Sequence, residues 1–160
     1  MRRTFSRAVG LFLFVTALVA WPVPTGRMTG GGWFTSGTQR INVGFELHCE
    51  TSDQPNNLEV NWGGNHFHLD QLASSACFDT GAPPNPPPAP FTTLYGAGPG
   101  TLNGTPGAWA NFGFADHGEP GTEDTVLYLF VSDDTGTMIL NAAGPIVLSG
   151  GNFQAHKDNK

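Results

Sequence analysis

The stretch RINVGFELHCE, residues 40–50, alternates apolar residues with polar or small ones from end to end. Alternation with a period of two predicts a β-strand that buries one face and exposes the other. The side chains expected in the core are Ile41, Val43, Phe45, Leu47 and Cys49. Because Cys49 belongs to this set, any disulfide that it forms is expected to lie at the core.

A second pair of strands is predicted in LEVNWGGNHFHLDQL, residues 58–72. The glycine-rich residues 63–65 suit the tight connection of a β-hairpin, because glycine readily adopts the positive φ angles of such turns. His66, His68 and Asp70 occupy every second position of the next strand, so they are expected on its solvated face.

The rest of the chain repeats the signal of short strands separated by turns. No segment after residue 26 keeps a helical pattern of apolar residues over three turns. An Asn103-Gly104 turn joins two strand-like segments, and residues 125–131 are apolar on both faces, which is typical of a central strand. Residues 150–160 are expected to be a mostly polar tail. Roughly eight to ten short strands predict an all-β fold, an antiparallel β-sandwich, with a jelly roll as its more specific variant.

A single domain is predicted for residues 27–157, since the chain has the length of one domain. Residues 82–90, APPNPPPAP, are expected to form an extended and exposed proline-rich loop within it. The segment before this loop is too short for an independent core, so the loop is not interpreted as a linker.

Residues 1–22 have the layout of a secretory signal peptide. A basic start, MRRTFSR, precedes the apolar run AVGLFLFVTALVA and an exit rich in helix breakers. Cleavage after Ala17 and cleavage after Ala20 both fit this layout, and an uncleaved N-terminal anchor is the alternative. The apolar run is shorter than the roughly 20 residues of a membrane span, so secretion is predicted.

Removal of residues 1–22 would leave four basic residues against thirteen acidic ones, a net charge of −9. Such a surface repels phosphate backbones and anionic lipid headgroups, so neither nucleic acid nor a membrane surface is expected as a partner. Cations are favoured instead, and calcium is the one cofactor that the sequence suggests.

Cys49 and Cys77 are the two cysteines of the chain. An even pair in an exported protein predicts one disulfide. Two free thiols, or half of a metal site, are the alternatives, although the sequence contains no C-x-x-C motif.

His66 and His68 are candidate ligands for a transition metal ion. Side chains at positions i and i+2 of a strand stand on one face, roughly 6.5–7 Å apart, so two imidazoles can hold one ion together with a third ligand. Asp70 and His48 are the candidates for that third ligand. The alternative is a polar strand face with two exposed imidazoles.

Residues 116–124, DHGEPGTED, are a candidate calcium loop. Calcium takes about six to eight oxygen ligands, often from flexible loops of this kind. The spacing is not that of an EF-hand, and a solvated turn is the alternative. The candidate ligands are Asp116, Glu119, Glu123 and Asp124.

Trp33, Trp62 and Trp109, together with Tyr95 and Tyr128, are candidates for a sugar-binding platform. The alternative is that these rings pack in the core. Many carbohydrate-binding modules are acidic, aromatic β-sandwiches, but that comparison is an analogy at the level of the fold. The sequence contains no G-x-S-x-G nucleophile elbow, and catalysis is not expected.

Four stretches together resemble a family of small domains in exported bacterial proteins: GFELHC at 44–49, PNNLEVNWGGNHFHL at 55–69, FADHGEPGTEDT at 114–125 and GGNFQAH at 150–156. Members of that family occur alone behind a signal peptide, or C-terminal to choice-of-anchor and other adhesion-like modules. The resemblance runs from about Met28 to His156 and implies an exported β-domain without an established activity.

The sequence therefore predicts a secreted cell-surface or matrix domain that binds a glycan or an extracellular protein. A second hypothesis is a structural subunit that self-assembles through exposed strand edges. A third is a metal-dependent hydrolase that uses the His66 and His68 pair.

Overall fold

The computed structural model describes residues 24–81 and 87–157 of the protein. The predicted signal peptide and residues 82–86 of the proline-rich loop lie outside the described residues. The described ranges contain β-strands and no helix. In chain order the strands are β1 (Arg27–Ser36), β2 (Gln39–His48), β3 (Asn57–Trp62), β4 (Asn65–Leu69), β5 (Ser74–Phe78), β6 (Thr93–Leu102), β7 (Thr105–Ala115), β8 (Thr125–Ser132), β9 (Met138–Val147) and β10 (Gly150–His156).

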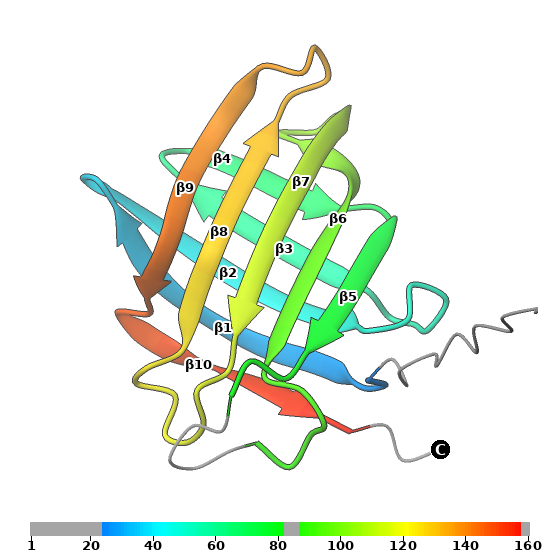
Figure 1. The fold of residues 1–160 in the computed structure, drawn as a ribbon. Helices are drawn as coiled ribbons and strands as arrows, with labels where there is room; N and C mark the ends of the chain where they lie inside the picture. Colours follow the sequence, from blue (N-terminus) through cyan, green and yellow to red (C-terminus); the bar gives the residue numbers. More distant parts are fainter. Residues whose placement is uncertain (1–23, 82–86, 158–160) are drawn as a thin grey trace, which may run out of the picture.

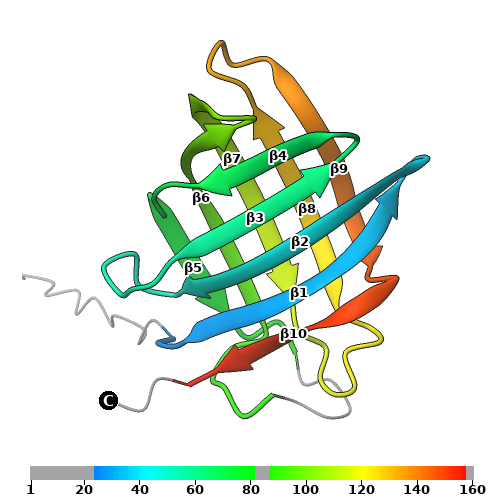
Figure 2. The same ribbon diagram turned by 180° about the vertical axis from the view of Figure 1, so that it is seen from behind.

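All of these strands belong to one antiparallel sheet, which confirms the all-β, antiparallel prediction. Its hydrogen-bonded order is β10-β1-β2-β3-β4-β6-β7-β8-β9, and β5 also pairs with β6. The sheet curls over, so that β5 to β9 face β1 to β4 and β10 and cross them obliquely (Figures 1 and 2). Neighbouring strands mostly follow one another in sequence. The described strands therefore form a curled meander, without the crossed connections of the jelly-roll variant.

The sheet turns from one layer into the other along β6. The first half of β6 pairs with β5, and its last residues pair with β4. Gly96, Gly98 and Gly100 lie on the buried side of this strand. A Cβ at Gly98 would overlap the carbonyl oxygen of Gln71, and one at Gly100 would overlap that of His68. Glycine is therefore required where the backbones meet at the corner.

One hydrophobic core fills the space between the two layers. The rings of Phe45 on β2 and Phe114 on β7 stack across it with 4.4 Å between their centroids. Phe153 on β10 meets Phe45 edge-on, with 4.9 Å between centroids. The apolar residues predicted to be buried in residues 40–50 are all in this core, so that prediction is confirmed.

Both predicted hairpin turns are present. Gly63-Gly64 joins β3 to β4, with Asn65 already paired in β4, and Asn103-Gly104 joins β6 to β7. Asn103 and Gly104 have φ angles of 53° and 84°, the positive values that a type I′ turn requires.

Residues 125–131 form β8, which lies inside the sheet between β7 and β9 as predicted, and its outer face is half-exposed. One prediction about a single segment needs correction. Residues 150–156, predicted as part of a polar tail, form β10 and pair with β1. Burial of Phe153 and Ala155 holds this strand against the core.

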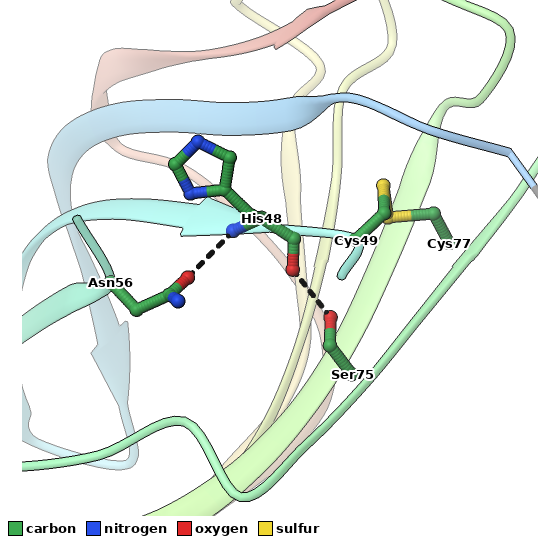
Figure 3. The surroundings of a disulfide bond; sticks show 5 residues. All are labelled: His48, Cys49, Asn56, Ser75 and Cys77. Carbon is green, nitrogen blue, oxygen red and sulfur yellow. Dashed lines mark hydrogen bonds between the residues drawn. A yellow bond between two sulfur atoms is a disulfide. The ribbon is translucent and has the colours of Figure 1, made fainter. Parts of the chain in front are cut away.

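Cys49 and Cys77 form the predicted disulfide, with 5.4 Å between their Cα atoms. Cys49 follows β2 and Cys77 lies in β5, so the bridge links the two layers (Figure 3). Beside it, Ser75 Oγ donates a hydrogen bond of 2.8 Å to the carbonyl oxygen of His48. The His48 N–H donates to the side-chain oxygen of Asn56 at 2.8 Å. The bridge and these bonds fix the end of β2.

The disulfide also indicates where the protein is located, because such bridges persist in oxidising environments. It therefore indicates an oxidising, extracellular type of environment for this chain. Within the described ranges there is no helix with the length and hydropathy needed to cross a bilayer.

Replacing both cysteines by serine is expected to lower the free energy of unfolding by about 3 kcal/mol, because the bridge then no longer restricts the unfolded chain. Urea denaturation followed by tryptophan fluorescence measures this loss. Wild-type protein in reductant is the control. Its unfolding midpoint should fall at the same urea concentration as that of the Cys49→Ser, Cys77→Ser variant. Equal midpoints for the oxidised wild type and the variant would contradict a stabilising role of the bridge.

Candidate functional site

The predicted histidine pair lies on the outer face of β4 and contacts a carboxylate of the next strand. Glu59 of β3 is the register partner of His68. His66 Nε2 and His68 Nδ1 bond to the two different carboxylate oxygens of Glu59. Burial opposes ionisation of Glu59, but the bonds with His68 and His66 outweigh it and lower the pKa of this carboxyl.

The two other candidate metal ligands lie elsewhere. Asp70 accepts a hydrogen bond of 3.1 Å from Thr101 Oγ1 on β6, and His48 is buried at the end of β2. In residues 24–81 and 87–157, no three His, Cys, Asp or Glu side chains are grouped so that they could hold a metal ion. The set of His66, His68 and Asp70 is therefore not assembled, because Asp70 lies past the end of β4 and bonds to β6 instead.

The acidic loop of residues 116–124 is attached to the edge strand β10. Asp116 Oδ2 accepts the N–H of Ala155 at 2.7 Å, and Asp124 Oδ2 accepts the N–H of Phe153 at 2.6 Å. The other oxygen of each carboxylate accepts a backbone N–H within the loop. Both aspartates are buried. They satisfy backbone donors on the side of β10 that faces away from β1.

The remaining two acids of the loop do not join these aspartates. Glu119 accepts hydrogen bonds from the side-chain amides of Gln154 and Asn152, and these bonds lower its pKa. Glu123 is exposed. Asp116, Asp124 and Glu119 thus bond to backbone or side-chain amides, and the described structure does not group the four predicted calcium ligands around one ion.

The three tryptophans do not share a surface, so a platform built from all of them is wrong. Trp62 is buried in the core. Trp33 on β1 stacks with Arg40, whose guanidinium carbon lies 4.1 Å from the ring centroid. Trp109 is 41% exposed on β7, in the opposite layer. Trp33 and Trp109 therefore lie on strands of different layers, β1 and β7 (Figure 1).

An aromatic surface does exist on the outer face of β5 to β9, and it includes both tyrosines of the prediction. Phe78 on β5, Tyr95 on β6, and Tyr128 and Phe130 on β8 follow one another across the strands. Their successive ring centroids are 5.9, 6.0 and 5.3 Å apart. Phe78 is 50% exposed and the other three are half-buried. We call these four residues the aromatic ladder.

Gly113 of β7 lies beneath the middle of the aromatic ladder. It is the register partner of Tyr95 on one side and of Tyr128 on the other. A Cβ at this position would come within 2.9 Å of the Tyr95 ring and 3.1 Å of the Tyr128 ring. The absence of a side chain at Gly113 therefore lets the two rings approach each other over β7. Burial and the neighbouring Tyr95 raise the pKa of Tyr128, so its hydroxyl is neutral at pH 7.

The strands that carry the aromatic ladder contain no charged residue and no histidine, and this holds for all of β5 to β9. The strands of the other layer carry arginine, glutamate and histidine. A depression of about 220 Å³ lies beside the ladder, and its lining includes Ser74, Ser75, Tyr95, Asn111 and Tyr128. This face therefore offers hydroxyl and amide groups next to aromatic rings, without a formal charge.

Comparisons with known proteins do not identify a relative. No family model, no curated protein and no solved structure matches the chain. The function is therefore argued from the geometry of the two outer faces and the loops.

Asp116→Ala is expected to lower the free energy of unfolding by about 2 kcal/mol or more, because the buried N–H groups of Gly118 and Ala155 lose their acceptor. Glu123→Ala, an exposed acid of the same loop, is the matched control and should change stability by less than about 0.5 kcal/mol. Urea denaturation measures both variants. Equal effects would contradict the assignment of Asp116 to the backbone of β10.

The pH dependence of stability is expected to report on Asp124. Burial raises its pKa to about 6, so protonation of this carboxyl favours the folded state. The group should therefore add about 1 kcal/mol of stability between pH 7 and pH 5, and this gain is lost as the pH rises again. Below about pH 4.5, protonation of Glu59 should lower the stability of the fold, because the pKa of this carboxyl is lowered in the folded protein.

Thermal unfolding of the wild type and of Asp124→Asn at pH 7 and pH 5 isolates this contribution. The melting temperature of the wild type should gain a few degrees more than that of the variant on acidification. The same pH response in both proteins would contradict a raised pKa for Asp124.

Proposed function

We propose that the protein is a secreted binding domain that holds a neutral polysaccharide on the aromatic ladder and the uncharged face around it. The observation that carries this proposal is the row of four rings on strands without any charged residue. Exposed apolar patches edged by polar groups often mark interaction sites.

The chemistry of the face fits a polyhydroxylated, uncharged ligand. The C–H faces of sugar rings are apolar and pack on aromatic rings, while their hydroxyl groups need nearby donors and acceptors. Asn111 and Ser74 supply an amide and a hydroxyl group beside Tyr95 and Tyr128. An anionic or cationic ligand would find no partner of opposite charge on these strands.

Two further observations support an extracellular role. The disulfide belongs to an oxidising environment, and the layout of residues 1–22 is that of a secretory signal peptide. The resemblance to exported bacterial domains agrees with both. A glycan of a cell surface or extracellular matrix is therefore the ligand class we favour, ahead of an extracellular protein.

The metal-dependent hydrolase stays a hypothesis with less support. It requires an open metal position beside His66 and His68, whereas both imidazoles bond to Glu59. We expect binding without turnover.

Tyr95→Ala and Tyr128→Ala are each expected to weaken binding of a neutral polysaccharide about tenfold or more, because each removes a stacking surface at the centre of the ladder. Affinity electrophoresis against a panel of neutral and acidic polysaccharides finds the ligand, and titration calorimetry then measures the dissociation constant. Tyr128→Phe keeps the ring and should retain most of the affinity.

His66→Ala, on the opposite layer, is the matched control and should bind like the wild type. Melting temperatures of all variants separate lost binding from lost folding. The proposal is wrong if no neutral polysaccharide binds, or if the two alanine variants bind as tightly as the wild type.

A further inference from the structure

The two edges of the sheet differ in how they are protected. The sheet ends at β10 on one side and at β9 on the other. On β10, the buried carboxylates of Asp116 and Asp124 accept the outward N–H groups of Ala155 and Phe153. That edge is therefore closed to a further strand.

The edge formed by β9 has no such cover in the described part of the chain. β9 pairs with β8 along one side, and no side chain among residues 24–81 and 87–157 hydrogen-bonds to its backbone. Its sequence, MILNAAGPIV, contains no charged residue. Met138 is 52% exposed and Ile139 is 39% exposed. A long, uncharged and partly apolar edge of this kind favours pairing with another strand.

The open part of this edge is limited to residues 138–143. Pro145 lacks an N–H, so the strand cannot continue an uninterrupted ladder past Gly144. Just beyond β9, the N–H of Leu148 donates to the carbonyl oxygen of Asp124, and that of Ser149 donates to Trp33. The C-terminal end of β9 is therefore fixed to the rest of the protein.

We propose that a second copy of this chain covers this edge, by antiparallel pairing of residues 138–142 in both copies around a two-fold axis at Leu140. An antiparallel edge is complementary to itself, so one strand can supply both sides of such an interface. The chain carries a net negative charge, yet this strand carries none, so like charges do not oppose the contact. Because β10 is closed, pairing uses one edge per copy and stops at a dimer.

This geometry has a consequence for the ligand-binding face, which rests on the function proposed above. A two-fold axis normal to the sheet keeps the outer faces of both copies on the same side. The two aromatic ladders then lie on one continuous uncharged surface, with β9 of each copy at its centre. A dimer would therefore bind a long polysaccharide at two sites, which raises the overall affinity through effective concentration.

Light scattering coupled to size-exclusion chromatography tests the pairing without any ligand. Wild-type protein with its disulfide intact should give twice the mass of one chain. Ile139→Lys combined with Asn141→Lys places like charges opposite each other across the two-fold axis and should give the mass of one chain. Ser52→Lys, an exposed change in the turn after β2, is the control and should remain a dimer.

Amide hydrogen exchange gives an independent measurement that needs no variant. Exchange of residues 138–143 should slow as the protein concentration rises, while that of β10 should not change.

A wild-type monomer at every concentration overturns the proposal. Assemblies larger than two chains overturn the closed dimer, because they would require the β10 edge as well. A dimer that persists in the double lysine variant overturns the assignment of β9. None of these outcomes depends on sugar binding, so failure of the dimer and failure of the proposed function are distinguishable.

Discussion

Close backbone contact at the corner of β6 is the constraint on which the rest of this structure depends. Gly98 and Gly100 bring this strand against the carbonyl groups of Gln71 and His68, where a side chain would overlap them. The sheet can therefore pass from β4 to β5 through a single strand and close over one core. The disulfide links the same two layers between the end of β2 and β5.

The curled sheet gives the protein two outer faces and two edges with different chemistry. Charged residues and histidines of the strands lie in β1 to β4 and β10, where Glu59 bonds to His66 and His68. The strands β5 to β9 are uncharged and carry the aromatic ladder. One edge is closed by the aspartates of the acidic loop, and the other is not covered by any of the described residues. This separation of charge and aromatic surface is what points to a neutral, extended ligand.

Strands with strict alternation and turns with glycine could be predicted from sequence, because these signals are local. The strand β1 was not predicted, because Gly30, Gly31 and Gly32 interrupt the alternation of apolar and polar residues. The site was harder to predict. Glu59 joins the histidine pair through cross-strand register. Asp116 and Asp124 bind backbone groups of a strand that lies 39 and 29 residues further along the chain. Sequence spacing shows neither relation. Tyr95 and Tyr128 were identified, but only the register over Gly113 shows that they stack together.

The most direct test of this account is the stability of Gly98→Ala against that of Gly44→Ala. Both glycines lie in strands with negative φ, but a Cβ at Gly98 would overlap backbone whereas one at Gly44 meets nothing within 4 Å. Urea denaturation should show a loss of about 3 kcal/mol or more for Gly98→Ala, or failure to fold, and no loss for Gly44→Ala. A Gly98→Ala protein as stable as the wild type would contradict the role of the β6 corner, and with it the arrangement of the two faces.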